Sequence, residues 1–188
     1  MKIRFSFKNH LSHSIFVYLG ALIVVPLLCS YSILLKTRPK DYERFSFFSE
    51  ALFVNDGSFK DKLFKVLPED LVIDLYDMER SDRTFKSYLS SHGLNSDICL
   101  LSETTLSNFK TIPFLDLTNT SWNKEDNYKI ENYSLGIKCK STLDTLFTFK
   151  DETYYLCVVK SSVHLKGLKK NSTTNQVNRV LEYLTTYE

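Results

Sequence analysis

The chain has 188 residues and a mass of 21.9 kDa, which suits one domain with a short additional segment. Hydrophobic residues make up 43% of it and charged residues 24%, a balance that excludes disordered and low-complexity proteins. The formal net charge is +2, but Lys2, Arg4 and Lys8 precede every acidic residue, so the rest of the chain is close to neutral. A neutral domain has no electrostatic preference for nucleic acid, and we expect no such partner.

Residues 14–35 form an uncharged segment, SIFVYLGALIVVPLLCSYSILL. Because about 20 apolar residues suffice to cross a bilayer, the segment predicts a single transmembrane helix with the lipid bilayer as its partner. The alternative is a cleaved signal peptide, whose apolar region is shorter, about 7–15 residues, and ends at a site with small residues. A lipoprotein site is disfavoured too, because Leu28 rather than a small residue precedes Cys29. We therefore expect an uncleaved signal-anchor.

The orientation of this segment is only weakly marked, because basic residues flank it on both sides in similar numbers. The residues before the segment include no acidic side chain, whereas Asp41 and Glu43 reduce the positive charge of the residues after it. We therefore expect the N-terminus on the cytoplasmic side. The predicted location is the cell membrane, with one pass. The predicted parts are a cytoplasmic tail at 1–13, the transmembrane helix at 14–35, a stalk at 36–46 and an extracytoplasmic domain at 47–188.

In the outer domain the apolar period alternates between two and 3.6, which indicates alternating strands and helices. Strands are predicted at 47–54, 71–77, 97–101, 135–139 and 154–160, with 112–117 running along or beside the sheet and a polar loop at 118–133. Helices are predicted to begin at Ser58, near Ser81 or Asp82, at Ser102 and after Asn171–Asn175. The expected fold class is α/β, an N-terminal transmembrane helix followed by one open, mostly parallel sheet.

The predicted helices have apolar inner faces. The first ends at Pro68 and buries Phe59, Leu63, Phe64, Val66 and Leu67. The second buries Phe85, Tyr88, Leu89 and His92, and Gly93 suits the left-handed position that ends a helix. The last repeats Val177, Val180, Leu181 and Leu184.

Three short sequence segments, together with the order of predicted strands and helices, resemble the first lobe of the extracellular solute-binding proteins of bacterial ABC importers. They are Gly93-Leu94-Asn95-Ser96-Asp97-Ile98, Phe114-Leu115-Asp116-Leu117-Thr118 and Tyr133-Ser134-Leu135-Gly136-Ile137. In the first segment the family has a proline before the Asp-Ile pair, and this chain lacks it. In the family a second proline follows the third segment, and Lys138 stands in its place. The likeness covers about 45–140, and the tail 153–187 would supply the returning strand and helix of the lobe. Members of the family are typically about twice as long because two lobes close on the ligand, so one lobe offers half a cleft.

Ligands of open α/β sheets lie beyond the carboxyl ends of the strands. Asp77, Ser102 and Glu103 are predicted at this edge, and Asn119 and Trp122 can reach it from the loop. These five residues form the tentative ligand site.

Each of the main candidates has a plainer interpretation. Trp122 is the only tryptophan, and its ring suits a binding surface, but an aromatic ring can equally be a hydrophobic plug that holds the loop down. The Glu103 carboxylate can simply interact with the positive end of a helix. Asp74 and Asp77 lie on opposite faces of a strand and cannot easily share a substrate.

No catalytic or metal-binding pattern is recognised. The four histidines are scattered, and H-E-x-x-H and C-x-x-C spacings are absent, so we expect neither a metal nor another cofactor. Ser107-Asn108-Phe109-Lys110 fits S-x-x-K but lacks the companion motifs of serine acylases. We therefore expect no enzymatic activity.

Three cysteines lie outside the membrane segment, an odd number that cannot all pair within the chain. Cys99 and Cys157 suit small apolar core positions. If a disulfide forms, Cys139 with Cys157 is the first pair to test.

Two functions follow from these observations. The first is a membrane-anchored ligand-recognition module like a solute-binding protein, accessory to an importer, with a small molecule as its partner. The alternative is a non-catalytic interaction or scaffold domain that binds another membrane protein. The second function predicts an exposed apolar patch where a missing lobe would dock.

Overall fold

A computed structural model of the chain describes residues 7–37, 40–77, 82–165 and 175–186. The chain divides into two compact units, Met1–Pro39 and Lys40–Glu188. Several predictions lie outside the described residues: the basic residues Lys2 and Arg4, a helix start at Ser81, the burial of the Phe85 side chain and most of the loop Asn171–Asn175.

The described residues of the first unit form one helix, α1 (Phe7–Thr37). Its described side chains, those of residues 18–33, are all exposed. The segment 14–35 is thus helical, as expected. However, within the described residues no helix combines the length and the apolar character that crossing a membrane requires. The transmembrane helix in the predicted fold class is therefore contradicted. The location at the cell membrane stays a prediction.

The second unit is built on a six-stranded sheet with the order β3-β1-β4-β8-β6-β5. The strands are β1 (Arg44–Ser49), β3 (Val72–Asp77), β4 (Ile98–Ser102), β5 (Tyr128–Ile130), β6 (Tyr133–Lys138) and β8 (Tyr154–Val158). β1 pairs in parallel with β3 and β4, whereas β8 is antiparallel to β4 and β6, and β5 is antiparallel to β6. The prediction of a mostly parallel sheet is therefore wrong, because the sheet is mixed.

The reason is the length and place of the connections. Parallel neighbours need a crossover of a dozen or more residues, which α2 (Asp56–Phe64) and α3 (Asp82–Ser91) provide for β1, β3 and β4. β5 and β6 are joined by the two residues Glu131 and Asn132, and Glu131 has a φ of 53°, so only a hairpin is accessible. Between β6 and β8 there is no α-helix among the described residues, and β8 runs back from the edge where β6 ends.

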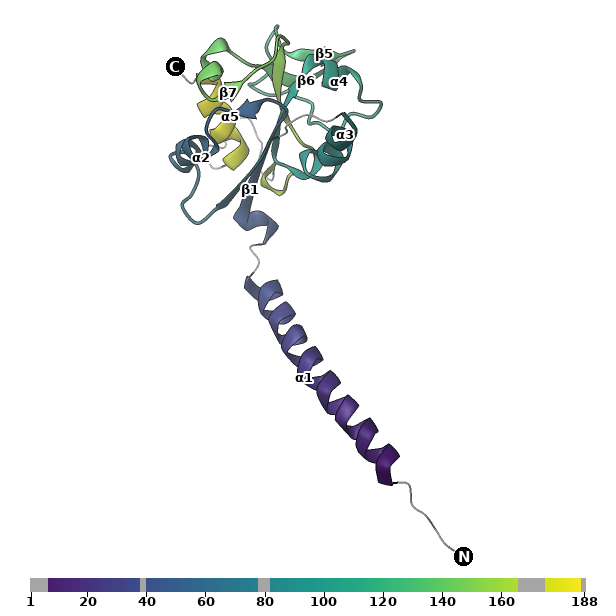
Figure 1. The fold of residues 1–188 in the computed structure, drawn as a ribbon. Coiled ribbons are helices and arrows are strands. Elements are labelled where there is room, and N and C mark those ends of the chain that lie inside the picture. The colour runs from purple at the N-terminus through teal and green to yellow at the C-terminus, as the bar shows by residue number, and fades with distance from the viewer. Residues whose placement is uncertain (1–6, 38–39, 78–81, 166–174, 187–188) are drawn as a thin grey trace, which may run out of the picture. The chain divides into compact units, whose positions relative to one another are not determined.

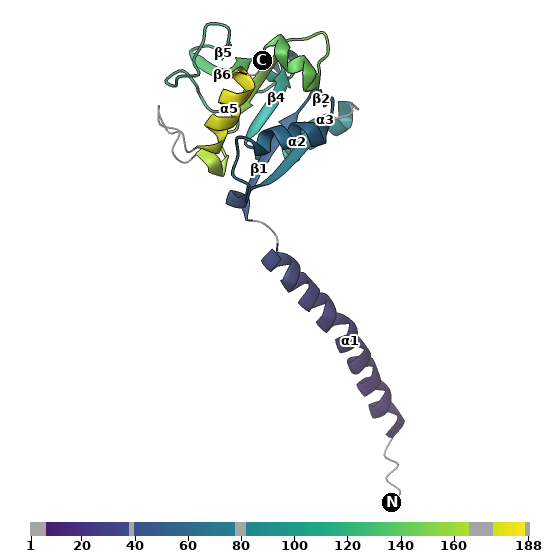
Figure 2. The ribbon, with the colours of Figure 1, turned by 90° about the vertical axis from the view of Figure 1, so that its left-hand side faces the viewer.

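Helices cover both faces of the sheet, α2 (Asp56–Phe64) and α5 (Gln176–Thr186) on one, α3 (Asp82–Ser91) and α4 (Glu103–Ser107) on the other, as Figures 1 and 2 show. Each face has its own buried cluster, which we call the α2/α5 core and the α3/α4 core. Phe47 belongs to the first and Phe48 to the second, because successive side chains of a strand point to opposite faces.

The strand predicted at 47–54 is interrupted. β1 ends at Ser49, and the chain continues into β2 (Leu52–Phe53), which pairs antiparallel with β7 (Phe147–Thr148) in a separate small sheet. The rings of Phe47, Phe53, Phe59 and Phe147 pack together in the α2/α5 core, with centroid distances from 5.1 to 6.3 Å. β2 and β7 therefore lie next to the carboxyl end of β1.

Other predicted boundaries shift for local reasons. α2 begins at Asp56 rather than Ser58, because the Asn55 side chain accepts a hydrogen bond from Ser58 N at 2.8 Å and caps the helix. The loop predicted at 118–133 contains β5. Phe114 forms an isolated bridge with Val159, so 112–117 does run beside the sheet, as expected.

Gly93 does not occupy a left-handed cap position; it begins a 3-10 turn, Gly93–Asn95. It is buried, and a Cβ there would lie 2.5 Å from Leu89 Cδ1 and 3.4 Å from the Phe48 ring. At this position the glycine allows close packing in the α3/α4 core and does not terminate a helix in the left-handed conformation.

All four cysteines are free. Cys99 and Cys157 are fully buried in the α3/α4 core, which confirms the expected core role. Cys139 packs against the α2/α5 core on the other face, so it forms no disulfide with Cys157.

Candidate functional site

The carboxyl ends of β1 and β4 meet at a buried carboxylate. Glu50, directly after β1, is 4% exposed. Its carboxylate oxygens accept hydrogen bonds from Ser102 N at 2.8 Å, Ser102 Oγ at 3.1 Å and Thr105 Oγ1 at 3.0 Å. In an open α/β sheet this is the crevice that a ligand would enter. Here the chain fills it with its own hydrogen-bonded side chain.

Three of the five predicted site residues share this edge of the sheet. Ser102 ends β4, is buried and caps α4 by accepting a hydrogen bond from Thr105 N at 3.2 Å. Glu103 is the exposed first residue of α4. Asp77 is the exposed last residue of β3, and its Oδ2 atom accepts a 3.4 Å hydrogen bond from Phe53 N.

The other two lie elsewhere. Asn119 is exposed and Trp122 half-buried in the segment after Leu117, whose N–H donates to Ser134 O at the start of β6. Since β6 runs parallel to β4, this start lies toward the amino edge. Trp122 packs against the α2/α5 core and donates from Nε1 to Asn178 Oδ1 at 3.2 Å. The structure thus places Trp122 as a plug that ties its loop to α5.

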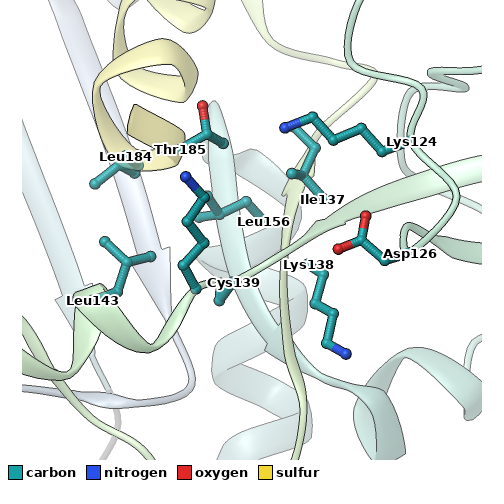
Figure 3. Close-up of a pocket in the computed structure, with 10 residues that line it drawn as sticks. Lys124, Asp126, Ile137, Lys138, Cys139, Leu143, Leu156, Leu184 and Thr185 are labelled. Carbon is teal, nitrogen blue, oxygen red and sulfur yellow. The ribbon is translucent and has the colours of Figure 1, made fainter. Parts of the chain in front are cut away.

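A small cavity of about 40 Å³ lies between the end of β6 and the last turns of α5 (Figure 3). Its buried lining is mostly apolar and includes Ile137, Leu156 and Leu184, with Thr185 as a buried polar residue. Its exposed lining residues are mostly lysines, with Asp126. Such a volume accommodates only a few water molecules. Burial raises the pKa of the adjacent Cys139 thiol, which keeps it protonated and unreactive at neutral pH.

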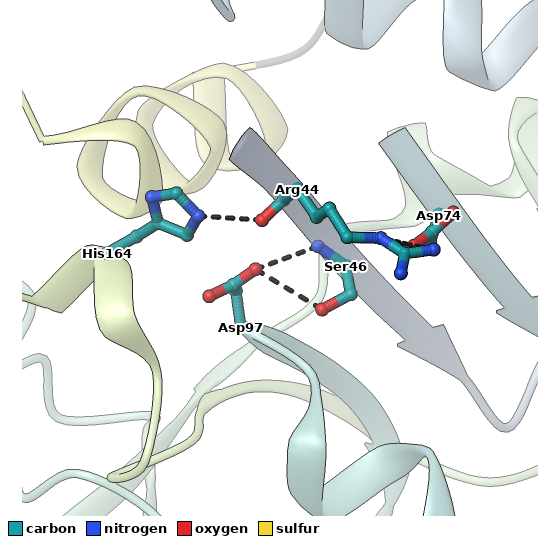
Figure 4. A network of polar contacts seen from close by, with 5 residues as sticks. All are labelled: Arg44, Ser46, Asp74, Asp97 and His164. Carbon is teal, nitrogen blue, oxygen red and sulfur yellow. Dashed lines mark hydrogen bonds and ion pairs between the residues drawn. The ribbon is translucent and has the colours of Figure 1, made fainter. Parts of the chain in front are cut away.

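A second polar network joins the amino ends of β1 and β4 (Figure 4). Asp97, 4% exposed, accepts from Ser46 N at 2.8 Å, from Ser46 Oγ at 3.3 Å and from the Ser162 hydroxyl. His164 Nε2 lies 2.7 Å from Arg44 O, and the Arg44 guanidinium pairs with Asp74 at 2.8 Å. The network ties the 3-10 turn Val163–Leu165, which follows β8, to β1 and β3.

This network contains serine, histidine and aspartate but does not form a nucleophilic triad. In a triad the imidazole accepts the proton of a serine hydroxyl. Here His164 Nε2 faces a backbone carbonyl, to which it can only donate, and the hydroxyls of Ser46 and Ser162 donate to Asp97. Its role is to hold the fold.

Asp116 lies in the second of the three segments that resemble solute-binding proteins, and it too has a structural role. Its Oδ1 accepts from Thr118 N at 3.0 Å, Thr118 Oγ1 at 2.6 Å and Ser134 N at 3.1 Å. Desolvation alone would raise its pKa, but these hydrogen bonds outweigh it and lower the pKa. The carboxylate fixes the chain where it approaches β6.

Sequence reasoning missed Glu50, because it lay inside a predicted strand. Its signal was an acidic residue between two apolar stretches, which a buried strand does not tolerate without partners. Within the described residues, no group of three or more histidine, cysteine or acidic side chains is placed to hold a metal ion. No family model matches the chain, and neither a curated protein nor a solved structure matches it.

Proposed function

We propose that residues 40–188 form a non-catalytic interaction domain that binds another protein through the carboxyl edge of its sheet. The observation that carries the proposal is a pair of exposed apolar side chains beside the filled crevice. Leu52 on β2 is 40% exposed and Val54, just after it, is 58% exposed. Exposed apolar groups that cluster at one place favour a protein contact.

The charges around these side chains suggest the character of the partner. Asp77 reaches Phe53 N, and the exposed Asp144 lies two residues before Leu146, whose carbonyl oxygen bonds Val54 N at 3.0 Å. Leu52 and Val54 are thus flanked by acidic groups. A partner surface that complements them carries an apolar side chain with basic residues beside it.

The filled crevice speaks against a small molecule at this edge. A ligand there would have to displace the Glu50 carboxylate from three hydrogen bonds, and a buried carboxylate without partners is costly. The cavity between the end of β6 and α5 is too small for a sugar.

The ligand-recognition function stays the second candidate, and one observation favours it. The tail supplies both β8, inserted between β4 and β6, and α5, which is the contribution expected of a returning strand and helix. Its test is a titration of the full chain with sugar and peptide panels while the fluorescence of Trp122 is followed. A flat response to every panel argues against it.

The interaction function is tested by co-purification of the full chain from its native source. Leu52→Ser combined with Val54→Ser removes the apolar pair, and Val163→Ser, at a residue with 43% exposure on the 3-10 turn Val163–Leu165, is the matched control. We expect a stoichiometric partner with the wild type and the control but not with the double variant. Equal recovery with all three, or no partner at all, contradicts the proposal.

A further inference from the structure

Two tyrosine rings meet on the α3/α4 face of the sheet near the carboxyl edge. Tyr128 on β5 is half-buried and Tyr155 on β8 is 7% exposed, and their ring centroids are 5.3 Å apart at an angle of 59°. Gly136 lies between them on β6. A Cβ at this glycine would be 2.9 Å from Tyr155 Cβ and 3.6 Å from Tyr128 Cβ, so its absence lets the rings approach.

Carboxylates surround this pair. Glu103, exposed at the start of α4, donates its N–H to Thr153 O at 2.9 Å, two residues before Tyr155, so it lies beside the start of β8. Its negative charge is felt by both tyrosine hydroxyls, and that of Asp126 by Tyr155. Burial is the main reason that the pKa of each tyrosine is raised, and the negative charge of Glu103 raises both further. The two carboxylates therefore contribute negative charge near the rings.

One lysine lies near this negative charge. Lys138 pairs with Tyr155 across β6 and β8, and Figure 3 shows its side chain extending away from Leu184. Among the described residues, however, no lysine or arginine is stacked on Tyr128 or Tyr155, and no hydrogen bond or ion pair engages the Glu103 carboxylate. An aromatic face beside an unpaired carboxylate is the arrangement that attracts an organic cation.

We propose that Tyr128, Tyr155 and Glu103 form a recognition site for an arginine side chain of the protein partner. The planar guanidinium stacks on the accessible face of the half-buried Tyr128 ring while its N–H groups donate to Glu103. The inference rests on the proposed function, because it specifies which chemistry the partner brings to the same edge of the sheet. It also explains Glu103, which the sequence singled out, together with two tyrosines that the sequence did not.

The test uses the full chain with 13C-labelled tyrosine rings and two probes, the peptides acetyl-Gly-Arg-Gly-amide and acetyl-Gly-Gln-Gly-amide. We expect the arginine peptide to shift the ring resonances of Tyr128 saturably and the glutamine peptide to leave them unchanged. Free L-arginine should bind more weakly than the arginine peptide, because its own carboxylate is repelled by Glu103. Tighter binding of free arginine would instead indicate a small-molecule site and overturn the assignment to a partner side chain.

Variants separate this contact from general electrostatics. Glu103→Gln should weaken the arginine peptide about threefold to fivefold, which is typical of an exposed ion pair. Tyr128→Leu should weaken it about threefold, and Lys138→Gln should tighten it by removing a like charge. Glu69→Gln, the same charge change at an exposed residue before β3, is the control and should have no effect.

Equal effects of Glu103→Gln and Glu69→Gln, or no saturable shift, would overturn the arginine site. Neither outcome bears on the interaction function, which the Leu52 and Val54 variants decide independently.

Discussion

Glu50→Ala is predicted to destabilise the domain strongly, because it removes the group that closes the crevice between β1 and β4. The substitution leaves the buried N–H of Ser102 without its acceptor, and an unpaired buried group costs about 1–3 kcal/mol. The hydroxyls of Ser102 and Thr105 lose a charged acceptor too, but they lie 3.2 Å apart and can still bond each other. Together we expect a loss of about 3–4 kcal/mol in the free energy of unfolding.

The magnitude is large against the roughly 5–15 kcal/mol that stabilises a typical domain. Glu50→Gln is the matched variant. Its amide oxygen can accept from Ser102 N while its NH2 group donates to the two hydroxyls, so we expect a loss of only about 1 kcal/mol.

Urea unfolding of the full chain, followed by the fluorescence of Trp122, measures both values, since this residue packs against the α2/α5 core. A loss below about 1 kcal/mol for Glu50→Ala, or equal losses for both variants, would show that the crevice is not held closed in the way described here.

Three further predictions concern stability. Burial raises the pKa of Asp97 above 3.8, and hydrogen bonds from Ser162 and Ser46 only partly offset this. The folded protein therefore favours the protonated carboxyl group. The stability that this group contributes is complete below the ordinary pKa and is lost as the pH rises through the folded-state pKa. In urea titrations the stability difference between wild type and Asp97→Asn should therefore fall as the pH rises from below the ordinary aspartate pKa through the folded-state pKa; a rising difference refutes the assignment. Gly136→Ala should cost about 1–3 kcal/mol by thermal unfolding, because the new methyl group meets two side chains at 2.9 Å, and an unchanged transition would contradict that contact. Trp122→Phe should cost about 0.5–1.5 kcal/mol by circular dichroism, through loss of the hydrogen bond to Asn178; if Asn178→Ala adds its full cost to that variant, the two side chains are not coupled.

The order of helices and strands could be predicted from local patterns. The spacing of apolar residues in 59–67, 71–77 and 177–184 identifies α2, β3 and α5. A helix or a strand that buries one face has apolar residues at a characteristic spacing, and a short stretch of sequence is enough to show it. The same patterns identified Cys99 and Cys157 as core residues. Short strands such as β2 and β7 have too few residues for a period, and pairing alone defines them.

The site depended on contacts between distant residues. Glu50 and Ser102 are 52 residues apart, and nothing near either in the sequence shows that one closes the crevice beside the other. Trp122 looked equally suited to a ligand and to the core until Asn178, 56 residues away, was found bonded to its indole. The meeting of Tyr128 with Tyr155 likewise needs β8 to run antiparallel to β6, a direction that the expectation of a mostly parallel sheet did not specify.

The sequence by itself therefore determined which segments are helical or extended and which of their faces are apolar, since these properties follow from residues within a few positions of one another. Only the tertiary structure decided the direction of β8, the closure of the crevice by Glu50 and the gathering of Glu103 with two tyrosines. Each of these depends on which strands become neighbours, and that choice is made by the packing of the whole domain.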